Sequence, residues 1–191
     1  MNRPGQEHRE GRLDAEPPDW EPYLFGALGT GFYLQALTIA SSGLVFGLAY
    51  LRMVPVPGQE PGWSSILTLF WPPASAMVLA LGLWYVGGLA RQKRNLQFVR
   101  LVGTSAFLLP LSQPVVRYAL GKPSGALRLV LSRLPSDEDR TGFLGTLGFL
   151  VLLILLLGLF LGIVTFVLFR RPGASTRFEQ APAAVRGRRG P

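Results

Sequence analysis

The sequence predicts an all-α fold: a multi-pass membrane bundle of four transmembrane helices plus one short interfacial amphipathic helix. Hydrophobic residues make up 49% of the 191 residues and charged residues only 16%, below the roughly 25% usual in soluble domains. The charges are concentrated in two tails and the connecting loops, and three long stretches hold none. Uncharged apolar stretches of about 20 residues have the length that crosses a bilayer as a helix.

The chain divides into two polar tails and one transmembrane domain. Residues 1–22 are polar and proline-containing, so we expect a flexible tail. No apolar core follows an initial positive patch there, which argues against a cleaved signal peptide. Residues 23–170 hold the four helices, and residues 171–191 are expected to form a disordered basic tail.

The first transmembrane helix is expected at residues 23–51. Trp20 and Tyr23 stand at its start, where amphipathic rings suit the headgroup layer. Arg52 ends it. The stretch exceeds the ~20 residues needed to cross, so we expect it to tilt.

The second transmembrane helix is expected at residues 68–90 and contains Pro72 and Pro73 near its start. Each proline removes an amide donor, which the interior of a membrane helix tolerates poorly. The first turn has no helical partner for those donors. We therefore expect the helix proper to begin near Trp71, with residues 64–70 lying along the interface.

The third transmembrane helix is expected at residues 98–120, although this segment contains Pro110, Pro114 and Arg117. An arginine at the centre of a membrane helix costs ~3 kcal/mol, whereas one near the end can extend to the interface. Arg117 lies near the far end of the segment. The segment therefore has an acceptable length and composition for a crossing.

The last two predicted helices follow in order. Residues 126–134 form a short amphipathic helix, expected to lie on the membrane surface. Its apolar residues recur on one helical face: Leu127, Val130, Leu131 and Leu134. The fourth transmembrane helix, residues 142–169, contains no charged residue and ends at Arg170.

Basic residues set the expected orientation, because lysine and arginine beside transmembrane helices are retained in the cytoplasm. With four crossings and both termini cytoplasmic, thirteen basic residues lie inside and five outside, with Arg117 at the boundary. Without the third crossing, twelve basic residues would lie inside and seven outside. We therefore expect a cell-membrane protein with four crossings and both termini in the cytoplasm.

The composition excludes several kinds of chemistry. The chain has no cysteine, which excludes disulfides and thiolate metal sites. The one histidine, His8, lies in the tail, so histidine-ligated metals or haem inside the bilayer are excluded. The expected helices hold no carboxylate, and no P-loop lysine follows the glycine-rich stretches. We predict no catalytic residue, metal ligand or cofactor, and we do not expect an enzyme.

Two stripes of small residues are candidate helix-packing surfaces. They consist of Ala36, Ala40, Gly43 and Gly47 in the first helix, and Gly158 and Gly162 in the fourth. Small residues allow a neighbouring helix to approach closely. The stripes fit self-association, docking to a larger membrane complex, or packing within the bundle, and we favour packing within the bundle.

Three polar residues are candidates for a substrate site: Gln35, Gln113 and Arg117. A proline-broken helix that carries an arginine can bind an anionic substrate, because charge and freed backbone groups converge there. The structural alternative is that Gln35 forms hydrogen bonds between helices and that Arg117 extends to lipid phosphate.

We expect a non-catalytic membrane protein that acts through helix–helix association, as an accessory or assembly subunit or as a homo-oligomeric scaffold. Its expected partners are the lipid bilayer and other membrane proteins or a second copy. Anionic lipid is a candidate partner of the C-terminal arginines, and nucleic acid is not expected because no folded binding module accompanies them. The alternative is a small carrier or channel component with a polar path lined by Gln35, Gln113 and Arg117.

Overall fold

The structure is a computed structural model that describes residues 20–53, 62–122 and 124–170. The two expected tails lie outside these ranges, apart from residues 20–22. The predicted all-α fold is confirmed for the described residues, which form helices and no strand. The elements are α2 (Glu21–Leu51), α3 (Trp63–Arg91), α4 (Leu96–Ser105), the 3₁₀ helix η1 (Ala106–Ser112), α5 (Pro114–Ala119), α6 (Gly125–Arg133) and α7 (Asp137–Phe169).

Three of the described helices are long and apolar enough to cross a membrane: α2, residues 66–91 of α3, and α7. The longest, α7, begins earlier than expected because Ser136 caps it. The Ser136 hydroxyl accepts the Asp139 N–H at 3.0 Å and donates to the Asp139 carboxylate at 2.7 Å. Acidic residues in this first turn also interact favourably with the helix dipole.

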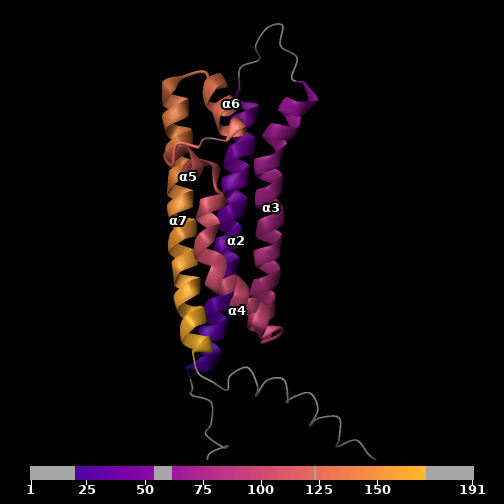
Figure 1. The fold of residues 1–191 in the computed structure, drawn as a ribbon, viewed down its shortest axis with the longest axis vertical. Coiled ribbons are helices and arrows are strands. Elements are labelled where there is room, and N and C mark those ends of the chain that lie inside the picture. The colour runs from indigo at the N-terminus through magenta and orange to yellow at the C-terminus, as the bar shows by residue number, and fades with distance from the viewer. Residues whose placement is uncertain (1–19, 54–61, 123, 171–191) are drawn as a thin grey trace, which may run out of the picture.

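The long helices stand side by side, and α2 packs against both α3 and α7 (Figure 1). The segment α4–η1 packs on α7. The start of α2, the α3–α4 turn and the end of α7 lie at one end of the bundle, while α6 lies at the other (Figure 1). We call the first the basic end, after Arg91, Lys93, Arg94, Arg100 and Arg170, and the second the α6 end.

The expectation that a helix begins near Trp71, with both prolines in its first turn, is wrong. Helix α3 begins at Trp63, so Pro72 and Pro73 lie inside it rather than in its first turn. Without proline N–H groups, the carbonyls of Thr68 and Leu69 lose their usual helical donors. Prolines also bend helices, and the first turns of α3 lean away from α2 (Figure 1).

The segment expected as a third transmembrane helix, residues 98–120, consists of parts of three short elements. Pro110 lies in η1, where the tighter 3₁₀ helix replaces the α-helix. Gln113 is extended, with φ −74° and ψ 138°, as expected for a residue that precedes proline. Together α4, η1 and α5 lead from the basic end toward the α6 end, and α5 lies beside α7 (Figure 1).

The helix expected on the membrane surface is present as α6, and its apolar face packs on the protein. Ser124 caps it by accepting the Leu127 N–H at 3.2 Å. Leu127 and Val130 are fully buried, in a cluster with Phe46 of α2 and with Phe143 and Leu147 of α7. Its periodicity was predicted correctly, but the surface that covers its apolar face is protein instead of lipid.

Candidate functional site

Gln35 is fully buried near the middle of α2. Its Nε2 donates to the carbonyl oxygens of Ala106 and Ile154, each at 3.4 Å. Pro110 has no N–H to donate to the Ala106 carbonyl as in an α-helix, and the chain continues there as the 3₁₀ helix η1, whose carbonyls pair with the amide three residues later. Gln35 therefore joins α2 to α7 and to the first turn of η1.

Two glycines allow α4 and η1 to approach α7 closely. A Cβ added at Gly158 would lie only 2.7 Å from the Ala106 carbonyl oxygen, and one added at Gly103 would collide with the Thr165 hydroxyl. Gly162 is the other small residue predicted in α7, and a Cβ added there would lie 4.0 Å from the Gly103 carbonyl oxygen. Gly103 could not be predicted from the sequence as a contact residue, because it stands alone rather than in a stripe of small residues.

Small residues also form the contact between α2 and α3. A Cβ added at Gly43 would lie 2.9 Å from the Ala76 Cβ, and one added at Gly29 would lie 3.0 Å from the Gly87 carbonyl oxygen. Ala36, midway between Gly29 and Gly43, is 2% exposed. The α2 stripe is therefore occupied largely by the chain's own α3, and Ala40 is partly buried beside the same core.

Other glycines face open space. In α7, nothing lies within 4 Å of a Cβ added at Gly142, Gly145 or Gly148, and the same holds for Gly47 of α2. Gly142 also lines a cavity of about 470 Å³ between the end of α2 and the start of α7, which we call the α2–α7 groove. Apolar residues such as Val45 and Leu48 line one part of it, and the charged residues Arg52, Glu138 and Asp139 line another.

Two of the three polar candidates, Gln113 and Arg117, line one cavity of about 970 Å³. Gln113 is 8% exposed, whereas Arg117 is exposed. Because Pro72 and Pro114 also line this cavity, we call it the proline groove. Gln35 lines neither this groove nor the α2–α7 groove. The lining also holds hydroxyl residues that come from elements distant in sequence: Ser42, Thr68, Ser75, Ser112 and Ser124.

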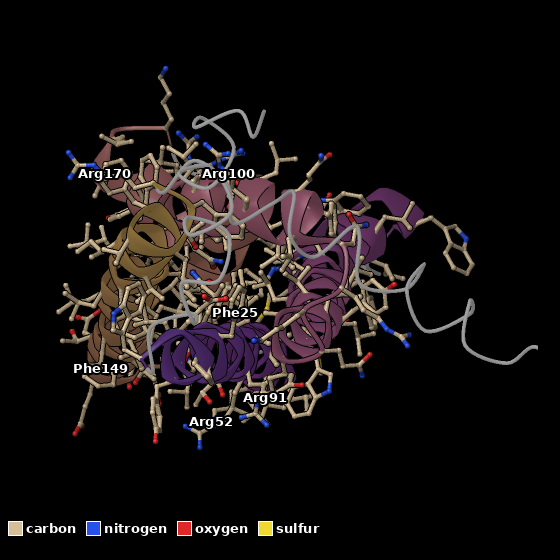
Figure 2. The ribbon with its side chains drawn as sticks, turned by 90° about the horizontal axis from the view of Figure 1, so that it is seen from below. Phe25, Arg52, Arg91, Arg100, Phe149 and Arg170 are labelled. Atoms are coloured by element: carbon tan, nitrogen blue, oxygen red, sulfur yellow. The ribbon has the colours of Figure 1, made fainter. Side chains whose placement is uncertain are left out.

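Cations at the basic end lie over aromatic rings. The pairs are Arg91 with Tyr33 (4.8 Å to the ring centroid), Lys93 with Phe25 (5.2 Å), Arg100 with Phe169 (5.9 Å) and Arg170 with Phe166 (5.5 Å). Arg100 and Arg170 lie on one side of the bundle and Arg91 on the opposite side (Figure 2). Such contacts contribute about 0.5–1 kcal/mol at exposed sites, and they hold the cations at the rim of the apolar bundle.

Acidic residues in the first turn of α7, at the α6 end, form ion pairs with nearby arginines. Asp137 pairs with Arg140 at 2.8 Å, and Asp139 lies 3.8 Å from Arg52 at the end of α2. Across the described ranges, no group of three or more histidine, cysteine, aspartate and glutamate side chains could hold a metal ion. Comparison of the chain with models of protein families, with curated proteins and with solved structures finds no match.

Proposed function

We propose that this chain is an integral protein of the cell membrane that crosses the bilayer four times. Three crossings correspond to α2, α3 and α7, and the fourth to α4–η1–α5. Large apolar side chains on the outside support hydrocarbon as the solvent: Leu67 of α3 is 69% exposed, Val78 72% and Leu81 71%. In water, so extended an apolar surface is rare on a monomer.

We propose further that the basic end is cytoplasmic. Both described ends of the bundle and the α3–α4 turn lie together there (Figure 1). With both tails on that side, it carries thirteen of the 19 basic residues. This asymmetry supports the orientation, because basic residues beside membrane helices are retained in the cytoplasm.

The function that we propose is non-catalytic association with other membrane helices, as an accessory or assembly subunit or as a scaffold of identical copies. The observation that carries it is the open glycine surface of α7 beside the α2–α7 groove. Glycine inside a helix costs about 1 kcal/mol relative to alanine, and exposed small residues in membrane helices favour close helix contacts. Gly43 and Gly158 already contact the chain's own helices, so Gly145 and Gly148, which also face open space and lie nearer the bilayer than Gly142, are the better candidates for a partner helix.

A carrier or channel remains the alternative proposal and has less support. A polar path would have to connect Gln35 with Gln113 and Arg117. Gln35 is enclosed by α2, η1 and α7, and it lines neither of the two grooves.

Substituting Gly145→Leu tests the association proposal. The larger side chain should prevent a partner helix from approaching, without touching the chain's own helices. In mild detergent, and after cross-linking in membranes, we expect the wild type to form a larger complex and the variant to remain monomeric with a Tm that is not lowered.

Gly82→Leu is the matched control, because a Cβ added at Gly82 of α3 also meets nothing within 4 Å. This variant should keep the complex. Gly158→Leu should instead lower the Tm, because its side chain would meet the backbone of Ala106. A wild type that is monomeric in both detergent and membranes, or a complex that survives Gly145→Leu, would contradict the proposal.

A further inference from the structure

We propose that the proline groove binds one anionic phospholipid of the surrounding bilayer. Its phosphate would lie at Arg117, and one acyl chain would run beside Val78 and Leu79. The site goes beyond helix association, and it is separate from the α2–α7 groove.

The groove exists because two proline-interrupted elements face each other. Pro72 and Pro73 interrupt the hydrogen bonding of α3, and Pro114 starts α5 after the extended residue Gln113. Pro72 and Pro114 line the same cavity, whose inner wall is formed by buried residues of α2 and α7 such as Ser42 and Leu147. Its volume of about 970 Å³ lies at the upper end of the ~300–1,000 Å³ typical of ligand sites.

The charge of the lining favours an anion. Arg117 is the one charged residue among those that line the cavity, and none of them is aspartate or glutamate. Within the part of the chain that the structure describes, no carboxylate forms an ion pair with Arg117. A guanidinium binds phosphate oxygens through two parallel hydrogen bonds, and basic sites between membrane helices commonly hold lipid headgroups.

The position of the groove along the bundle suits a lipid that stands upright in one leaflet. At 1.5 Å per residue, Leu147 lies about 34 Å along α7 from Arg170, close to one hydrocarbon thickness of ~30 Å. By the same measure, Val78 lies about 20 Å along α3 from Arg91. If the basic end lies at one interface, the upper part of the groove meets the opposite headgroup layer and Val78 lies within hydrocarbon.

The open side of the groove is apolar, as an acyl chain requires. Leu67 is 69% exposed, Trp71 74% and Val78 72%. A soluble anion such as inorganic phosphate has no apolar group that could contact this wall. The combination of one cation at the headgroup level with an apolar wall below it therefore points to a lipid.

Native mass spectrometry of the purified full chain tests the proposal with two probes, phosphatidylglycerol and phosphatidylcholine of identical acyl chains. We expect the wild type to retain phosphatidylglycerol preferentially. Arg117→Gln should lower that preference about tenfold, as expected for the loss of one charge-assisted contact. Arg128→Gln, which removes an exposed cation of α6 outside the groove, should leave it unchanged.

A second variant, Ala74→Trp, distinguishes a lipid bound in the groove from bulk lipid that Arg117 contacts at the surface. Ala74 is exposed and lines the groove, so a tryptophan there should block the acyl chain and reduce retention while Arg117 remains. Equal retention of the two lipids, or an unaffected Arg117→Gln or Ala74→Trp variant, would overturn the proposal. Displacement of the lipid by millimolar inorganic phosphate, or cross-linking of a second copy through Val78, would assign the groove to another occupant. Gly145→Leu should retain the lipid, so this proposal and the association proposal can fail separately.

Discussion

At Gln35, one side-chain amide is shared between two carbonyls from different elements. Both hydrogen bonds are 3.4 Å long, beyond the usual 2.7–3.2 Å, and Gln35 Oε1 is buried without a partner among the described residues. Hydrogen bonds between membrane helices contribute about 0.6 kcal/mol on average. The gain from two long bonds and the cost of the unpaired oxygen should therefore nearly cancel, so Gln35 stabilises the bundle mainly by filling space.

Two substitutions at Gln35 separate its volume from its polarity. Gln35→Leu keeps most of the volume and removes the unpaired oxygen, so we expect its unfolding free energy to change by less than about 1 kcal/mol. Gln35→Ala leaves a cavity and should cost about 2 kcal/mol or more. Thermal unfolding in detergent, followed by tryptophan fluorescence, gives the comparison. A loss in the leucine variant equal to that in the alanine variant would show that the amide itself holds the helices together.

At the scale of elements, Pro110 decides where Gln35 finds its acceptor. The proline leaves the Ala106 carbonyl without the amide four residues later, and the chain continues as η1. The 3₁₀ pattern of η1 pairs this carbonyl with the amide three residues later, so the Gln35 amide is a second donor to an oxygen that has two lone pairs. The break in the third segment and the glutamine of α2 therefore complement each other, although 71 residues separate Gln35 from Ala106.

A double-mutant cycle between Gln35 and Pro110 measures this link. Pro110→Ala supplies an N–H for the Ala106 carbonyl, so the Gln35 amide should become less important. We expect Gln35→Leu to cost about 0.5–1 kcal/mol less in the Pro110→Ala background than alone, by the same thermal measurement. Strictly additive effects would mean that Pro110 and Gln35 act independently.

The elements that could be predicted from the sequence are those whose pattern lies within neighbouring residues. The uncharged length of residues 142–169 predicted α7, and the spacing of Leu127 and Val130 predicted α6. Neither pattern reveals the covering surface, because leucine packs equally well on lipid and protein. The stripe containing Gly43 likewise reveals a smooth helix face without identifying α3 as its neighbour. Pro72 was misplaced because its tolerance inside α3 depends on tertiary surroundings that local rules do not include.

On the scale of the whole molecule, the long helices exceed the bilayer that they are proposed to cross. Helix α7 has 33 residues, or about 50 Å at 1.5 Å per residue, against ~30 Å of hydrocarbon. If the basic end lies at one interface, Phe143 lies about 40 Å away along the helix, beyond the opposite edge of the hydrocarbon. Its ring contacts Phe46 edge-to-face at 5.8 Å, and α6 covers this apolar cluster. The cap provided by α6 therefore shields turns that lipid tails do not reach.

The four-crossing topology predicts which loops are accessible from outside the cell. The chain contains no cysteine, so single cysteines can be introduced without background from the chain itself. A membrane-impermeant maleimide added to intact cells should label Lys122→Cys and Ser136→Cys, both exposed at the α6 end. It should label Gln92→Cys, in the α3–α4 turn, only after the membrane is permeabilised. If residues 92 and 136 are labelled from the same side, then α4–η1–α5 does not cross and the two tails lie on opposite faces. If residue 92 is labelled outside and residues 122 and 136 only inside, the four crossings stand and the orientation is reversed.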